Sequence, residues 1–274
     1  MPAAPILLRY GPAAEQFTEL TLPAAKPATE PVTEPVTEPA SHPPYPVVVL
    51  VHGGFWRARY DVAAIRQLVP RFAAQGYAVA AIEYRRVGQP GGGWPGTLTD
   101  VAAAVDSLAT DPAARDLALN RLGVLGHSAG GHLALWLAAR HRLPASAPGG
   151  PPVVEPAFAV SLAGVCDLVT AAGQGMGDGA VRDVLGGMPD EVPDRYAVAD
   201  PITLLPLGVP TLLVSGNRDV SVTVEQSRTY RDRAQTAGDE VELLEIPKGD
   251  HFVVVDPGAP HWTAVDRRLA EALR

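Results

Sequence analysis

Six short apolar runs are spread along this chain, with helical patterns between them. They cover residues 47–51, 78–82, 122–125, 158–162, 211–214 and 241–246. All but the last lack the regular alternation of polar and apolar residues that is typical of a strand with one solvent-exposed face. This is expected for strands that are buried on both faces. Runs of this kind that alternate with helices are typical of a mostly parallel sheet with helices on both faces. We therefore predict an α/β fold.

Two of the helical patterns can be placed from their apolar residues. The first is spaced as on one face of a helix and consists of Leu98, Val101, Val105 and Leu108. Thr97 and Asp100 form a capping-box pattern at its start, so a helix is predicted to begin there. The second pattern runs from Val62 to Phe72. Pro70 lies within it and is expected to kink or interrupt that helix.

The composition limits the partners that the chain can bind. It has 274 residues, with 30 acidic and 22 basic side chains and a net charge of -8. We expect residues 1–274 to form a single domain, which is long enough to bury a large core. Because there is no positive excess to neutralise phosphates, nucleic acid and anionic membranes are not expected as partners. A small molecule is therefore the expected partner.

The sequence also predicts the cellular location of the protein. Cys166 is the single cysteine and cannot form an internal disulfide, so nothing indicates an oxidising compartment. Residues 1–9 lack the basic start and long apolar core of a signal peptide, and no run approaches the roughly 18–20 apolar residues of a membrane span. We expect a soluble cytoplasmic protein and leave a homodimer open.

Two segments differ from the rest in composition. Residues 23–45 contain a Thr-Glu-Pro triplet repeated every four residues. Proline at that density and repelling glutamates favour an extended, solvated loop over helix or sheet. Residues 166–205 are punctuated by glycine and proline without a sustained period, and we predict that they form a short cap over the site.

The strongest motif is Gly126-His127-Ser128-Ala129-Gly130, which follows the run 122–125 and precedes a helical pattern. A nucleophile on a sharp strand-to-helix turn needs small neighbours, and the two glycines meet that need. The turn would present the Ser128 hydroxyl to a cleft and the Ala129 amide to an oxyanion at the positive end of the helix. Ser128 is therefore the candidate nucleophile, against the alternative of a solvated serine in a glycine-rich turn.

A second motif, His52-Gly53-Gly54-Phe55-Trp56, follows the run 47–51. The absence of side chains at Gly53 and Gly54 lets their backbone N–H groups approach a ligand, as an oxyanion hole requires. We predict that these two amides act together with that of Ala129. His52, at the end of a buried strand, is interpreted as a residue that fixes the loop and not as the base.

The candidate acid and base that would act with Ser128 lie in loops that follow later predicted strands. Asp219 follows the run 211–214 and His251 follows 241–246, so both should lie at the carboxyl edge of the sheet together with Ser128. His251 would be the base, and Asp219 would orient it. Asp167 and Asp250 remain alternatives for the acid.

The other reactive side chains are interpreted as structural. The five-residue spacing of His127 and His132 does not suit a pair of metal ligands on one helix face, and Cys166 is expected to be a buried thiol. No metal or cofactor is expected. An aromatic substrate pocket could be lined by Phe55, Trp56 and Trp94, although aromatic residues near a cleft pack in the core at least as often.

With these motifs in place, the chain resembles the α/β-hydrolase superfamily, and within it the esterase and arylformamidase branch marked by H-G-G-x-W. Residues 52–56, 126–133, 164–168 and 249–252 carry the resemblance. It implies an α/β-hydrolase fold, with the amides of Gly53, Gly54 and Ala129 as the oxyanion hole. Relatives with this mark include carboxylesterases and kynurenine formamidases, which release formate from N-formylkynurenine. The Thr-Glu-Pro segment is not a family feature.

The sequence thus predicts a serine hydrolase that cleaves a carboxylic ester or an aryl formamide through an acyl-enzyme. A small peptidase of the same fold is an alternative. A protein that binds a small ligand without catalysis is another, although binding alone gives no reason to assemble Ser128, Asp219 and His251.

Overall fold

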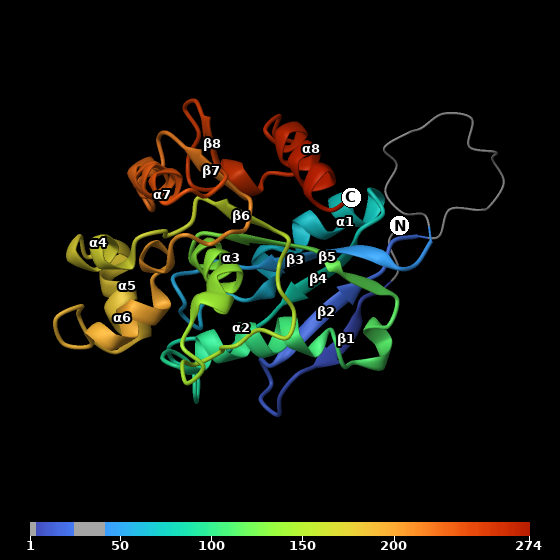
Figure 1. Cartoon of the computed structure of the whole chain (residues 1–274), viewed down its shortest axis with the longest axis horizontal. Coiled ribbons are helices and arrows are strands. Elements are labelled where there is room, and N and C mark those ends of the chain that lie inside the picture. The colour runs from blue at the N-terminus through green and yellow to red at the C-terminus, as the bar shows by residue number, and fades with distance from the viewer. Residues whose placement is uncertain (1–3, 25–41) are drawn as a thin grey trace.

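The computed structural model describes residues 4–24 and 42–274. Within these residues, eight strands form one sheet in the order β1-β2-β4-β3-β5-β6-β7-β8 (Figure 1). They are β1 (Ile6–Arg9), β2 (Phe17–Thr21), β3 (Tyr45–Val51), β4 (Ala78–Ile82), β5 (Leu117–His127), β6 (Phe158–Leu162), β7 (Thr211–Gly216) and β8 (Val241–Ile246). The strands from β4 to β8 in this order pair in parallel, whereas β1 and β2 pair antiparallel. The predicted mostly parallel α/β fold is confirmed.

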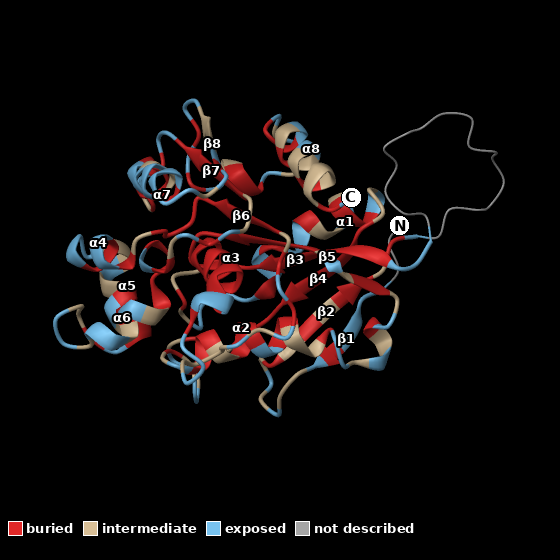
Figure 2. Cartoon of the chain, in the orientation of Figure 1, coloured by how far each residue is buried: buried red, intermediate tan, exposed pale blue. Residues whose placement is uncertain are grey.

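The sheet separates two cores, because successive residues of a strand point to opposite faces. Val47, Val49 and Val51 of β3 belong to one core, and Val48 and Leu50 belong to the other. The first core is covered by α2 (Gly96–Ser107), α3 (Ala129–Ala139) and α7 (Val224–Thr236), and the second by α1 (Val69–Ala74) and α8 (Trp262–Ala272). Figure 2 shows the buried strands between helices whose outer faces are exposed. This burial on both faces explains the unbroken apolar runs.

Two strands and several strand ends were not predicted. β1 has only one buried residue, Leu8, and β2 continues the antiparallel part of the sheet, so neither has the apolar run of a central strand. β3 begins at Tyr45, within the stretch predicted as loop, because Tyr45 and Pro46 pair with the start of β5. Most of that predicted loop, residues 25–41, lies outside the described residues.

The predicted capping box is wrong. The N-cap of α2 is Pro95, and the Thr97 hydroxyl accepts from the Gly93 amide and donates to the Arg85 carbonyl. Asp100 is buried and takes three hydrogen bonds from Arg85, so its carboxylate fixes a loop and not the helix start. The interruption at Pro70 is confirmed: two short 3-10 turns, Val62–Ala64 and Arg66–Leu68, precede α1, and Pro70 lies in its first turn, where a missing N–H is tolerated.

The segment predicted as a cap folds into short helices beside the carboxyl edge of the sheet. They are α4 (Leu168–Gly173), α5 (Met176–Leu185), α6 (Pro193–Ala199) and a 3-10 turn at Pro201–Leu204. Figure 1 shows α4, α5 and α6 grouped at one end of the molecule. No helix among the described residues is long and apolar enough to cross a membrane.

Candidate active site

The turn that contains Ser128 joins β5 to α3 without an intervening loop. β5 ends at His127, Ser128 has φ 57° and ψ -119°, and α3 begins at Ala129. A serine with this φ is strained, and such strain persists only where the surroundings fix it. The Ser128 amide donates to the Leu162 carbonyl of β6 at 2.9 Å. The backbone therefore holds this side chain at the positive end of a helix.

Glycines make the turn possible by removing side chains where the backbones meet. A Cβ at Gly126 would lie 1.9 Å from the Gly130 carbonyl oxygen, and a Cβ at Gly130 would lie 2.1 Å from the carbonyl oxygen of Val51. Both distances are far below any van der Waals contact. The motif's glycines are thus required by the approach of α3 to β3 and β5.

Replacing Gly130 with alanine is expected to destabilise the fold by at least about 3 kcal/mol, because the new methyl group meets backbone that cannot move away. The free energy of unfolding in urea checks this. Gly173→Ala is the matched control, since nothing lies within 4 Å of its added Cβ. It should be neutral or stabilise by up to about 1 kcal/mol. Equal effects in the two variants would contradict the steric argument.

His251 and Asp219 form a buried hydrogen-bonded pair. His251 Nδ1 lies 2.6 Å from Asp219 Oδ2, and both residues are less than a tenth exposed. The other carboxylate oxygen, Oδ1, accepts from the amides of Ser221 and Val222 at 2.8 and 2.9 Å. Amides of its own loop therefore fix the Asp219 carboxylate while its other oxygen contacts the imidazole. Ser128 is also buried, and its hydroxyl forms no hydrogen bond with the described residues.

The two alternative acids are engaged elsewhere. Asp167 caps α4, where its carboxylate accepts from the amide and the hydroxyl of Thr170. Asp250 accepts from the amides of Phe252 and Val253 within its own turn. Of the three carboxylates, the structure places that of Asp219 against the His251 ring.

The loop formed by residues 52–56, called the 52–56 loop below, turns sharply after β3. Gly54, Phe55 and Trp56 have φ values of 112°, 52° and 54°, three consecutive residues in the left-handed region. A Cβ on Gly53 would lie 3.0 Å from the Cβ of Ser128, which places this glycine directly beside the candidate nucleophile. The amides of Gly53, Gly54 and Ala129 donate no hydrogen bond within residues 4–24 and 42–274. They are therefore free to bind an anion.

His52 fixes the 52–56 loop, as the sequence indicated. Its Nε2 lies 3.1 Å from Glu83 Oε1 and its Nδ1 lies 2.8 Å from the Gly53 carbonyl. Tyr84 stacks on the imidazole and donates its hydroxyl proton to the His52 carbonyl at 2.8 Å. A ring held on both nitrogens and on one face cannot swing into the site.

His127 has a role that sequence reasoning missed. Its Nε2 lies 3.0 Å from the backbone carbonyl of His251, and its ring lies 4.7 Å from the His251 ring, centroid to centroid. Its Nδ1 would be 3.2 Å from a Cβ on Gly53. The residue before Ser128 therefore lies between the His251 ring and the 52–56 loop. No spacing rule relates positions 127 and 251, so the sequence held no signal for this contact.

Burial keeps two histidines near the site neutral. It lowers the pKa of His127 to about 4, and the adjacent His251 ring acts in the same direction. Burial also lowers the pKa of His132 to about 4. Cys166 is buried, as expected, and burial raises the pKa of its thiol to about 12, so it is no competing nucleophile.

These shifts predict how stability depends on pH. Between about pH 4 and 6.5, His127 and His132 are protonated in the unfolded state but not in the folded state. Asp200 opposes them, because burial raises its folded pKa to about 7. His261 acts in the same direction as the other two histidines, because burial lowers its pKa as well. The unfolded state thus binds at least one more proton, and the free energy of unfolding should fall by at least ~1.4 kcal/mol per pH unit as the pH is lowered. Urea titrations between about pH 5 and pH 6 measure this slope.

Variants separate the contributions of these groups to the slope. Asp200→Asn removes the opposing proton and should make the slope steeper by ~1.4 kcal/mol per pH unit. His127→Asn should make the slope shallower by about the same amount. An unchanged slope in both variants would show that these groups do not control the titration.

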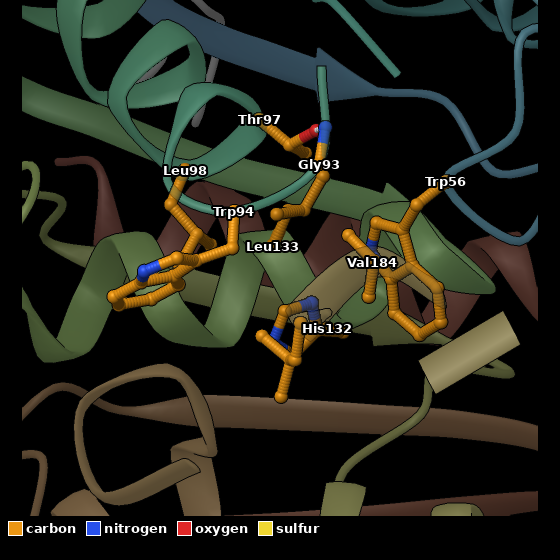
Figure 3. Close-up of a pocket in the computed structure, with 9 residues that line it drawn as sticks. Trp56, Gly93, Trp94, Thr97, Leu98, His132, Leu133 and Val184 are labelled. Carbon is orange, nitrogen blue, oxygen red and sulfur yellow. Dashed lines mark hydrogen bonds between the residues drawn. The ribbon is translucent and has the colours of Figure 1, made fainter. Parts of the chain in front are cut away.

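The three aromatic residues predicted for a substrate pocket have different surroundings. Trp56 is fully buried, and with Trp94 it lines a small pocket next to α2 and α3 (Figure 3). The Phe55 ring is half-buried and lies against Gly177 of α5, where a Cβ would come within 2.4 Å of it. Trp56 therefore has no surface for a substrate to touch in this structure, whereas Phe55 and Trp94 remain candidates for substrate contact.

The part of the chain that the structure describes holds no group of three or more His, Cys, Asp or Glu side chains arranged to bind a metal ion. The chemistry available at the carboxyl edge of the sheet is that of a strained serine, a carboxylate-bound imidazole and three free amides.

The family model BD-FAE matches residues 36–233, most of the chain. The chain belongs to the BD-FAE family. The match covers both glycine motifs and Asp219, and it ends within α7, before β8 and His251. The family match and the mostly parallel eight-stranded sheet both place the BD-FAE chain in the α/β-hydrolase superfamily.

Individual known proteins also resemble this chain. "Esterase LipC" of Mycobacterium tuberculosis is 29% identical over 216 residues, which are 76% of this chain, and the chain spans about half (53%) of that relative. Among solved structures, esterase B from Lactobacillus rhamnosis has a TM-score of 0.75 at 22% identity and covers 100% of this chain and 85% of its own. Esterase Est2 from Thermogutta terrifontis has a TM-score of 0.70 at 21% identity, with 98% and 92% covered. These likenesses confirm the fold.

Proposed function

We propose that this chain is a serine hydrolase that cleaves carboxylic esters through an acyl-enzyme intermediate. The hydrogen bond between His251 Nδ1 and Asp219 Oδ2 carries the proposal, because it leaves Nε2 as the free ring nitrogen at the edge of the sheet where Ser128 lies. The free amides beside Ser128 supply the second requirement, donors for an oxyanion. The name of the Mycobacterium tuberculosis relative supports the same class of activity.

The mechanism follows from these roles. His251 Nε2 takes the Ser128 proton while Oγ attacks the carbonyl carbon, and the imidazolium that forms is stabilised by Asp219. The carbonyl oxygen becomes an oxyanion and accepts hydrogen bonds from the amides of Gly53, Gly54 and Ala129. His251 then protonates the leaving alcohol, and water attacks the acyl-enzyme with His251 again as the base. A linear amide would follow the same path with an amine as the leaving group.

Within this class, we propose that the substrate is either a carboxylic ester or an aryl formamide. The H-G-G-x-W motif at residues 52–56 supports both, because formamidases and carboxylesterases share it. The triad does not distinguish them, since both reactions pass through similar tetrahedral intermediates. A peptidase of the same fold and a catalytically silent binding protein are the competing functions.

The deciding experiment compares kcat/KM for a short-chain aryl ester with that for N-formyl-L-kynurenine, together with labelling by a fluorophosphonate. We expect Ser128 to be labelled and the ester to be cleaved. A higher value for the formamide would identify an arylformamidase, and a higher value for the ester a carboxylesterase. If the serine is unreactive and neither substrate is cleaved, the hydrolase proposal is wrong and the binding protein is favoured.

A further inference from the structure

Two residues that line a small pocket behind the 52–56 loop each carry a buried polar atom that has no partner among the described residues. The pocket is lined by Trp56, Gly93, Trp94, Thr97, Leu98, His132, Leu133, Val184 and Leu185. Trp56 Nε1 and His132 Nδ1 are both buried and form no hydrogen bond with the described residues. Figure 3 shows both rings at the same pocket, the indole from the 52–56 loop and the imidazole from α3. Buried polar atoms without a partner are rare, so the pair calls for an explanation.

The chemistry of the two atoms is complementary. The indole Nε1 can only donate. His132 Nε2 lies 2.9 Å from the carbonyl oxygen of Ala199, an acceptor, so Nε2 carries the proton of the neutral ring. The ring is neutral near pH 7 because burial lowers its pKa to about 4. His132 Nδ1 is therefore an acceptor, and a donor and an acceptor line one pocket.

The two atoms do not satisfy each other. The Trp56 and His132 rings meet edge to face, with their centroids 5.3 Å apart and an angle of 81° between their planes. The pocket has a volume of about 10 Å³ for a water-sized occupant, close to the minimum that one water molecule needs. Its other walls are mainly apolar, so it offers no room or partners for a larger group.

We propose that one water molecule is bound here as a fixed part of the fold, accepting from Trp56 Nε1–H and donating to His132 Nδ1. This water joins the 52–56 loop to α3. Through the bond from His132 to Ala199, it also joins the loop to the end of α6. The water thereby fixes the Trp56 end of the strained loop that carries the Gly53 and Gly54 amides. His132 and Trp56 act as positioning residues for these amides.

Nuclear magnetic resonance of protein labelled with 15N-tryptophan tests the site directly. The chain has four tryptophans, and Trp56→Phe assigns one indole signal by its loss. We expect the Trp56 indole proton to show a through-space transfer from a long-lived water. Trp136 and Trp262 are internal controls, because these buried indoles donate to the carbonyls of Val198 and Asp256. A Trp56 signal with no more water contact than theirs would overturn the proposal.

Two substitutions at His132 separate the water site from the bond to Ala199. His132→Gln can keep a donor toward Ala199 but removes the acceptor at the Nδ1 position, so the water transfer to Trp56 should be lost. His132→Asn places a carbonyl oxygen near the Nδ1 position and should keep it. The reverse pattern would contradict the assigned tautomer, and loss of the transfer in both variants would contradict the acceptor role of Nδ1.

The effect on turnover rests on the proposed function. If the chain hydrolyses esters, His132→Gln should lower kcat about tenfold with little change in KM, because one buried hydrogen bond that supports the oxyanion amides is lost. His132→Asn should restore kcat to within about threefold of the wild type. If no ester is cleaved, the resonance experiment still decides whether the water is bound, so failure of the function and failure of the site are distinguishable.

Discussion

Replacement of Ser128 by alanine is expected to reduce kcat for ester hydrolysis by on the order of 10⁴ to 10⁶, because no acyl-enzyme can form without the hydroxyl. The fold should survive, since the hydroxyl makes no hydrogen bond with the described residues and alanine keeps the Cβ at φ 57°. Steady-state kinetics and the intact mass after exposure to a phosphonate measure the two losses. We expect the wild type to gain the mass of one phosphonyl group and Ser128→Ala to gain none.

A matched control removes a buried hydroxyl from the neighbouring strand. Ser161 of β6 is fully buried, and its hydroxyl contacts the Cys166 sulfur at 3.8 Å. Ser161→Ala should keep both phosphonate labelling and turnover within about threefold of the wild type, because a single neutral contact of this kind contributes little. Residual labelling of Ser128→Ala, or turnover above a hundredth of the wild type, would exclude Ser128 as the nucleophile.

The parallel part of the fold was predictable because burial on both faces removes polar residues from a strand. All six apolar runs correspond to the strands β3 to β8. The limits of β4, β6 and β8 are as predicted, whereas β3, β5 and β7 extend beyond the predicted runs by two to five residues at an end. The antiparallel strands β1 and β2 were not predicted, because β1 is an edge strand with mostly exposed residues and β2 carries half-buried residues between its buried ones. Asp100 was assigned to a helix cap because its partner, Arg85, is fifteen residues away and no local pattern relates them.

The site was predictable to the extent that short motifs fix backbone. Gly126 and Gly130 are required by close contacts within the turn, and a glycine pattern of this kind is readable in sequence. Asp219 and His251 follow adjacent parallel strands, so their proximity could be expected, while their catalytic roles remain predictions. The contacts of His127 with His251 and of His132 with Ala199 depend on how loops return to the sheet. Such contacts between distant residues leave no local signal.

Replacement of Asp219 by asparagine is expected to reduce kcat by on the order of 10⁴ without unfolding the chain. Oδ1 of Asp219 accepts from the amides of Ser221 and Val222, and this pair of donors will keep the oxygen of an asparagine side chain. The NH₂ group then faces His251 Nδ1 in place of Oδ2. Because an NH₂ group donates, the imidazole must present Nδ1 as an acceptor and carry its proton on Nε2. It can then no longer take the Ser128 proton.

The tautomer itself can be measured, by the 15N chemical shifts of His251 in the wild type and in Asp219→Asn. We expect the proton to move from Nδ1 to Nε2 as turnover falls. Asp167→Asn is the matched control, because an asparagine caps a helix as well as an aspartate does and Asp167 only caps α4. Its kcat should stay within about threefold of the wild type. If Asp167→Asn proves as inactive as Asp219→Asn, or if the His251 tautomer is unchanged in an inactive Asp219→Asn, then Asp219 does not act by orienting His251.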